Sequence, residues 1–264
     1  MPGKERGENP RTLGPVRMTD LAAQPTERLE MLLQDEGRVF YRSVSSVDRS
    51  PLLVLAIERP TAQSLRRLQH EYAYRDELDA AWAARPLALV GDHGRSMLVL
   101  ADPGGILLSR LIGEPWEISS FIRVAIGIAV ALRCLHQHGL IHKDIKPEHV
   151  FVEVGTGAAW LTGFGIASRL KREHQAPDLP EMIAGTLAYM APEQTGRINR
   201  SIDARSDLYA FGITLYQMLT GVLPFNAVEP MEMIHCHIAP SATTAGTGGG
   251  RAGAALSDRA EAAG

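Results

Sequence analysis

The feature that most constrains the fold is a change in hydrophobic periodicity at Asp102-Pro103-Gly104-Gly105. Before this point, short apolar segments of strand length alternate with turns, and only residues 61–79 show helical spacing. After it, long apolar stretches have helical spacing, at residues 118–138 and 207–219. Because a Pro-Gly-Gly segment interrupts regular structure, the sequence predicts an α+β fold of two lobes joined by a hinge.

Individual elements follow from the same patterns and from their end signals. Thr61 can cap the helix at 61–79, Gly139 can end the helix at 118–138, and Gly221 can end the helix at 207–219. A short last helix is predicted at 231–238. Strands are predicted from apolar runs between turn residues at 38–44, 52–57, 86–89, 97–101, 150–154 and 159–162.

These elements divide the chain into four parts. Residues 1–28 carry charges, Pro and Gly without periodicity and are expected to form a flexible tail. Residues 29–101 form the small β-rich lobe, and residues 102–240 form the hinge and a partial helical lobe. Residues 241–264 contain 8 Ala and 6 Gly and one large apolar side chain, so a disordered tail is expected. The second lobe therefore looks truncated, and Leu215 or Leu219 should be more exposed than core residues.

Composition excludes several classes of function. The net charge of −3 gives no reason to expect a nucleic acid or an anionic membrane as partner. No run of 18 apolar residues occurs, so no membrane span is predicted. Two cysteines, Cys134 and Cys236, are too few for a disulfide framework or a zinc site, and a cytoplasmic location is expected.

Four motifs occur in order in the second lobe. They are IHKDIKPEHV at 141–150, LTGFGIA at 161–167, AGTLAYMAPE at 184–193 and SDLYAFG at 206–212. This set resembles the protein kinase family, specifically the Ser/Thr type, and the likeness covers roughly residues 29–240. The resemblance implies a bilobal kinase fold, an ATP-binding cleft between the lobes and transferase chemistry in signal transduction.

Three further segments resemble a narrower group. They are LTGFGIASRL at 161–170, EQTGRINRSID at 193–203 and HCHI at 235–238. They are similar to the N-terminal kinase-like domain of large bacterial hybrid proteins, in which an ATPase module and a sensor histidine kinase follow. This likeness implies a bacterial signalling protein of which the chain is a fragment or a short relative.

The kinase resemblance assigns roles to individual residues. Asp144 matches the base that accepts the proton of the substrate hydroxyl, and Lys146 matches the cation that neutralises the transferring phosphoryl group. Thr186 matches the threonine that holds this pair in register. Leu100, Ala101 and Asp102 match the hinge edge against which adenine binds, so ATP is a possible ligand.

Several phosphate-binding parts of a kinase are missing. The only glycine between Val16 and Val90 is Gly37, so a Gly-rich loop over the phosphates cannot form. No lysine lies between Lys4 and Lys143, so the strand at 52–57 lacks its phosphate-binding cation. Arg59 follows that strand and is expected to face solvent. Glu71 occupies the usual position of the helix glutamate without its lysine partner.

The metal-binding positions are also changed. His149 stands where the resemblance places a metal-ligating Asn, and Gly163 stands where it places the metal-ligating Asp. A neutral imidazole is a poor ligand for Mg²⁺, which prefers oxygen, and glycine offers no side chain. Magnesium binding is therefore doubtful, and no metal ligand is assigned.

Three functions are compatible with these residues. The first is a Ser/Thr-kinase-like signalling domain that is weakly active or a pseudokinase and acts by binding a protein partner. The second is an active Ser/Thr kinase that transfers the ATP γ-phosphate to protein, which the retained Asp144, Lys146 and Thr186 favour. A small-molecule phosphotransferase is weaker, because the segment 185–193 is typical of protein kinases.

Overall fold

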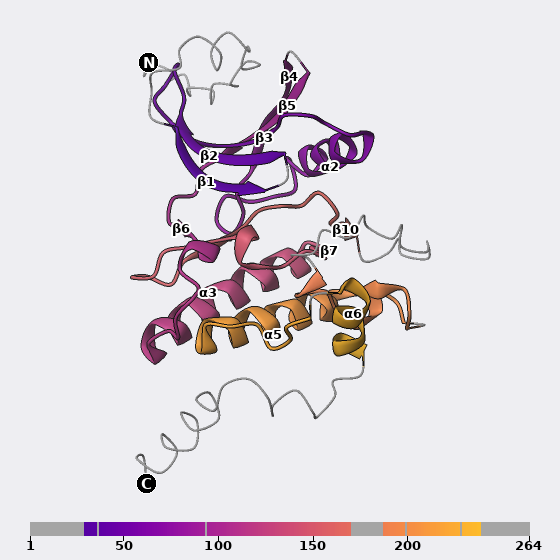
Figure 1. Cartoon of the computed structure of the whole chain (residues 1–264). Coiled ribbons are helices and arrows are strands. Elements are labelled where there is room, and N and C mark those ends of the chain that lie inside the picture. Colours follow the sequence, from indigo (N-terminus) through magenta and orange to yellow (C-terminus); the bar gives the residue numbers. More distant parts are fainter. Residues whose placement is uncertain are drawn as a thin grey trace, which may run out of the picture.

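The computed structural model describes residues 29–238 apart from 36, 93, 170–186, 199 and 228. The two tails predicted at 1–28 and 241–264 therefore lie outside the described residues. So does Thr186. A β-sheet forms the first lobe and helices dominate the second, with the hinge at 102–105 between them, as the periodicity predicts (Figure 1).

The first lobe is a five-stranded antiparallel sheet with one helix. Its strand order is β1-β2-β3-β5-β4. The strands are β1 (Glu30–Asp35), β2 (Arg38–Val44), β3 (Pro51–Ile57), β4 (Pro86–Asp92) and β5 (Arg95–Ala101). Strand β1 was not predicted, because its sequence EMLLQD lacks a period of two and it pairs only with β2, at the edge of the sheet.

Helix α2 (Ala62–Ala73) packs beside this sheet (Figure 1). Thr61 caps it as predicted: its side chain accepts a hydrogen bond from the Ser64 amide, and the Ser64 hydroxyl accepts one from the Thr61 amide. The helix ends before Asp79, where the sequence prediction placed its end. Tyr74 and Leu78 continue the helical spacing but belong to the core of the second lobe, so the chain turns away after Ala73.

The second lobe is built around two long helices. They are α3 (Ile118–Gln137), which Gly139 follows in a left-handed conformation, and α5 (Ala204–Thr220), which Gly221 ends in the same way. Helix α6 (Pro230–Ile238) is the last helix among the described residues. Short 3₁₀ turns complete the lobe at η1 (Leu108–Arg110), η2 (Pro147–His149) and η3 (Pro192–Thr195).

Five short strands link the helices to the hinge and the site. Strands β6 (Ile106–Leu107), β8 (Val150–Val152) and β9 (Ala159–Leu161) form one antiparallel sheet. Strands β7 (Leu140–Ile141) and β10 (Ser168–Arg169) form another. The residues between β7 and β8, and those between β9 and β10, carry the first two sequence motifs.

Each lobe has its own hydrophobic core. The core of the first lobe joins its sheet and α2 to Leu107 and Phe151 from the second lobe. The larger core of the second lobe gathers the inner faces of α3, α5 and α6. The described part of this lobe leaves Leu219 41% exposed, as expected of a truncated lobe, whereas Leu215 is partly buried.

Helix α3 has a second apolar face. Ile118, Ile122, Ile126 and Val130 recur every four residues and are exposed. This helix has the length and apolar composition of a membrane span, although Arg123 and Arg133 interrupt its run of apolar residues, so no span was predicted from the sequence. Its opposite face is buried in the core of the second lobe through Val124, Ile128, Ala131, Leu132 and Leu135.

Candidate functional site

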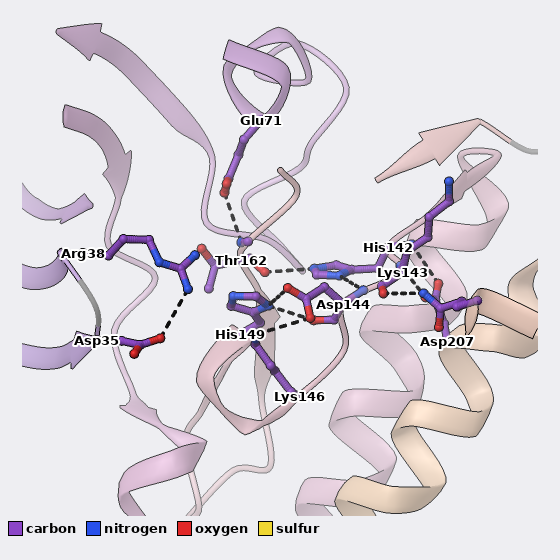
Figure 2. Close-up of polar contacts among 12 residues, drawn as sticks. Asp35, Arg38, Glu71, His142, Lys143, Asp144, Lys146, His149, Thr162 and Asp207 are labelled. Atoms are coloured by element: carbon purple, nitrogen blue, oxygen red, sulfur yellow. Dashed lines mark hydrogen bonds and ion pairs between the residues drawn. The ribbon is translucent and has the colours of Figure 1, made fainter. Parts of the chain in front are cut away.

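The loop between β7 and η2 places Asp144 and Lys146 side by side. The Lys146 ammonium lies 3.3 Å from one Asp144 carboxylate oxygen. Burial, the largest cause, would raise the pKa of Asp144, but Lys146, His149 and His142 together outweigh it and the pKa falls to about 2. Asp144 is therefore an ionised carboxylate beside a cation at neutral pH (Figure 2).

His142 fixes the backbone of this loop. Its Nε2 donates to the Thr162 carbonyl at 2.9 Å, while its Nδ1 accepts from the Asp144 amide at 3.2 Å. One nitrogen donates and the other accepts, so the ring is a single neutral tautomer. Burial lowers the pKa of His142, which agrees with this assignment.

Asp207 anchors the same loop from below. Its carboxylate is fully buried and accepts hydrogen bonds from the His142 amide at 2.9 Å and the Lys143 amide at 2.8 Å. His136 Nε2 donates to it as well, at 2.8 Å. Lys143 has φ of 68°, a left-handed conformation that is costly outside glycine. The two hydrogen bonds from the His142 and Lys143 amides to Asp207 hold the loop in this strained form.

His149 fills the space in which a metal ligand is expected. Its Nδ1 donates to the Asp144 carbonyl at 2.8 Å, and its ring stacks against Gly163. A Cβ on Gly163 would lie 2.6–2.7 Å from three ring atoms of His149. Burial lowers the pKa of His149 to about 3, so the imidazole is neutral at neutral pH.

Glu71 projects from α2 into the site, toward the backbone near Thr162 (Figure 2). Its carboxylate accepts a hydrogen bond from the Gly163 amide at 3.0 Å. Burial raises the pKa of this carboxyl to about 7, against the opposing effect of the backbone amides of Phe164 and Gly163. Where a kinase would pair this glutamate with a lysine, the chain pairs it with the backbone after β9.

The hinge offers no backbone donor across residues 101–104. The Ala101 amide donates to the Arg85 carbonyl at 2.8 Å, and the Asp102 amide donates to the Pro51 carbonyl at 3.2 Å. Pro103 has no N–H, and the Gly104 amide donates to the Asp102 carboxylate at 2.9 Å. Leu100 is buried. The residues predicted to contact adenine therefore supply apolar surface and carbonyls, but no free amide among 101–104.

Arg42 fixes the hinge to the sheet. Its Nε donates to the Asp102 carboxylate at 2.6 Å, and one terminal nitrogen donates to the Gly105 carbonyl at 2.8 Å. The Asp102 side chain is 3% exposed, so this charge-assisted pair is protected from solvent. The sequence analysis missed Arg42, since nothing near Arg42 in the sequence indicates that it faces the hinge.

A cavity of about 310 Å³ lies beside the Asp144 loop, between the lobes. Its floor contains Asp144, His149 and Gly163, and its wall is formed by the N-terminal half of α2 and the turn before β2. Three arginines line it: Arg38, Arg59 and Arg67. The sequence prediction that Arg59 faces only solvent is incomplete: the residue is exposed and also lines this cavity.

Comparison with known proteins identifies the fold. The family model described as "Protein kinase domain" matches residues 59–247. The chain belongs to the protein kinase family. Among kinases it is 38% identical over 135 residues to the serine/threonine-protein kinase Pkn1 of Myxococcus xanthus, covering 50% of this chain and 19% of Pkn1.

Two further kinases support the Ser/Thr type. The serine/threonine-protein kinase PknB of Mycobacterium tuberculosis is 31% identical over 194 residues, covering 72% of this chain and 29% of PknB. A probable serine/threonine-protein kinase of Clostridium perfringens is 38% identical over 145 residues, covering 53% of this chain and 20% of its own length. The chain thus spans about a fifth to three tenths of the length of these kinases.

The magnesium that a kinase implies does not fit the residues of this kinase domain. Three carboxylates line the cavity and each already has a partner: Asp144 pairs with Lys146, Asp35 contacts Arg38, and Glu71 accepts from the Gly163 amide. The imidazole of His149 occupies the space beside Gly163, where a second carboxylate would need to stand. Among the described residues, no group of three His, Cys, Asp or Glu side chains could hold a metal ion.

Proposed function

We propose that this kinase domain is a signalling module in which phosphoryl transfer is weak or lost, so that it acts as a pseudokinase through binding a protein partner. The observation that carries the proposal is the His149 ring stacked against Gly163, because it removes the room for a second metal ligand. Without metal, the charge on the β- and γ-phosphates is not offset in the transition state, which costs several kcal/mol.

A second observation supports the proposal. No free amide in residues 101–104 can hold adenine, so ATP is expected to bind weakly. The resemblance to hybrid bacterial signalling proteins fits a role as a receiving or docking domain within a larger cytoplasmic protein. The partner is then a protein.

An active Ser/Thr kinase is the alternative, and one observation favours it. Asp144 and Lys146 lie 3.3 Å apart, so the base and the cation of phosphoryl transfer are both present. Thr186, their third expected partner, lies outside the described residues.

One experiment separates the two functions. The purified chain is incubated with ATP and Mg²⁺ or Mn²⁺, and transfer is measured to the chain itself and to a library of Ser/Thr peptides. Asp144→Asn is the control for genuine chemistry. We expect no transfer above the level of this variant. Transfer that Asp144→Asn abolishes would show that the chain is an active kinase.

A further inference from the structure

The cavity beside Asp144 contains two arginines with which its carboxylates do not pair. It is lined by the carboxylates of Asp35, Glu71 and Asp144 and by three arginines. Each carboxylate is already engaged: Asp35 contacts Arg38 at 3.4 Å, Asp144 contacts Lys146, and Glu71 accepts from the Gly163 amide.

The two remaining arginines have no such partner among the described residues. Arg59 follows β3 and is exposed, and Arg67 lies on α2 and is half-buried. Neither has a hydrogen bond or an ion pair with another residue in the part of the chain that the structure describes. Both line the same cavity, where Thr61 and Ser64 add hydroxyl groups from the start of α2.

Arginine is suited to bind phosphate in the absence of a metal. Its planar guanidinium stays charged and can donate two parallel hydrogen bonds to one phosphate group. The carboxylates that line the cavity are engaged by Arg38, Lys146 and the Gly163 amide, so we expect side chains to offset the negative charge of a phosphate chain in place of a divalent cation. Arg59 and Arg67 are the side chains available to do so.

We propose that this cavity binds the phosphate chain of a polyphosphate ligand through Arg59 and Arg67 without a divalent cation. The inference rests on the proposed function, because it uses the same cleft with its metal positions replaced. The chemistry recognised is a run of two or three phosphates, which a nucleotide or an inorganic polyphosphate can supply. Since the hinge provides no free amide at 101–104, the phosphates contribute most of the affinity.

The test is calorimetric titration of the purified chain at fixed ionic strength. The probes are ATP, inorganic tripolyphosphate and adenosine, each with Mg²⁺ and with EDTA. We expect ATP and tripolyphosphate to bind in EDTA with Kd values within about threefold of those in Mg²⁺, and adenosine to bind at least tenfold more weakly. Equal affinities for ATP and tripolyphosphate would identify the phosphate chain itself as the ligand. A tenfold higher affinity for ATP would identify a nucleotide.

Variants assign the binding to the two arginines. The double variant Arg59→Ala/Arg67→Ala is expected to lose tenfold or more in affinity for tripolyphosphate, because both charge-assisted hydrogen-bond donors to the phosphates are removed. The double variant Arg59→Lys/Arg67→Lys keeps the charge but not the bidentate geometry. Its affinity for tripolyphosphate should lie between those of the native chain and the double alanine variant. Arg66→Ala is the matched control: Arg66 is the exposed neighbour on α2, does not line the cavity, and should change the affinity less than twofold.

Three results would overturn the inference: binding that requires Mg²⁺, equal losses in Arg66→Ala and the double variant, or no binding of either phosphate compound to the folded chain. None of them depends on phosphoryl transfer. The proposed function fails separately, if Asp144-dependent transfer is found. Thermal melting of each variant checks that it is folded.

Discussion

The imidazole of His149 occupies the space that a side chain at Gly163 would need. A Cβ at residue 163 would lie within 2.7 Å of Cγ, Cδ2 and Nε2 of His149. The two departures from a kinase motif are therefore coupled: the glycine makes room for the ring, and the ring closes the metal position. Reversing one change without the other should fail for steric reasons.

Gly163→Asp alone should destabilise the fold. The new Cβ collides with a ring that is held by its bond to the Asp144 carbonyl, so we expect a loss of about 2 kcal/mol or more in the free energy of unfolding. His149→Asn in the same chain should recover much of this loss. Only the double variant should show a rise in melting temperature when Mg²⁺ and ATP are added together, because both side chains are needed to ligate the metal.

Gly139→Asp is a control for backbone strain. Gly139 has φ of +72°, close to the +82° of Gly163, but no atom lies within 4 Å of its hypothetical Cβ. The difference between the two Asp variants therefore measures the collision with His149. Equal losses at both positions, with no recovery in the double variant, would contradict the coupling.

The stability of the domain should respond to the ionisation of Glu71. Burial raises the pKa of this carboxyl from 4.5 to about 7, so the folded state favours the protonated form. Its contribution to stability is full below pH 4.5 and is lost as the pH rises to about 7. Glu71→Gln should therefore gain about 3 kcal/mol relative to the native chain between pH 4.5 and 7, since one pKa unit is worth about 1.4 kcal/mol.

Urea unfolding of both proteins at a series of pH values checks this. The Gln side chain keeps an oxygen that can accept from the Gly163 amide, so the comparison isolates the charge. Parallel stability curves for Glu71→Gln and the native chain would show that the carboxyl is not destabilised by its burial.

His149 should act in the opposite direction. Burial lowers its pKa from 6.5 to about 3, so the folded state favours the neutral ring. This contribution to stability is complete above pH 6.5 and declines as the pH falls toward 3. His149→Asn should therefore be less sensitive to acid than the native chain. Between pH 6.5 and 4, the free energy of unfolding of the native chain should fall by about 2 kcal/mol or more relative to that of His149→Asn.

A histidine outside the site provides the comparison. His235 is an exposed residue on α6, and His235→Asn should leave the shape of the acid unfolding curve unchanged. If the stability of His149→Asn falls with acid as much as that of the native chain, the acid sensitivity does not come from His149.

Asp207 should be essential for the Asp144 loop. Three donors face its buried carboxylate, and two of them are amides of the strained segment at Lys143. Asp207→Ala leaves these donors unpaired, so we expect a loss of about 3 kcal/mol or more in stability. Faster hydrogen exchange at the His142 and Lys143 amides is the specific readout. Asp203→Ala, which removes only the N-cap of the same helix, should cost about 1 kcal/mol and leave these two amides protected.

Local sequence determined most of the secondary structure. Thr61 and Gly139 mark helix ends because each acts on backbone groups within a few residues of itself. The strands at 38–44 and 52–57 are found within one residue of their predicted bounds, because apolar runs between turn residues specify extended structure. The order of the motifs also placed Asp144, Lys146, Gly163 and His149 on loops of the second lobe.

Tertiary structure decided the chemistry of the site. Strand β1 forms by pairing with β2 at the edge of a sheet that other segments build, so no local sequence pattern predicts it. The pairing of Glu71 with Gly163 joins residues 92 positions apart, and the Arg42 bond to Asp102 joins residues 60 apart. Arg59 and Arg67 meet at one cavity only because β3 and α2 converge there. Residue types can be read along the chain, but whether a charge is paired, buried or available depends on neighbours that only the folded chain brings together.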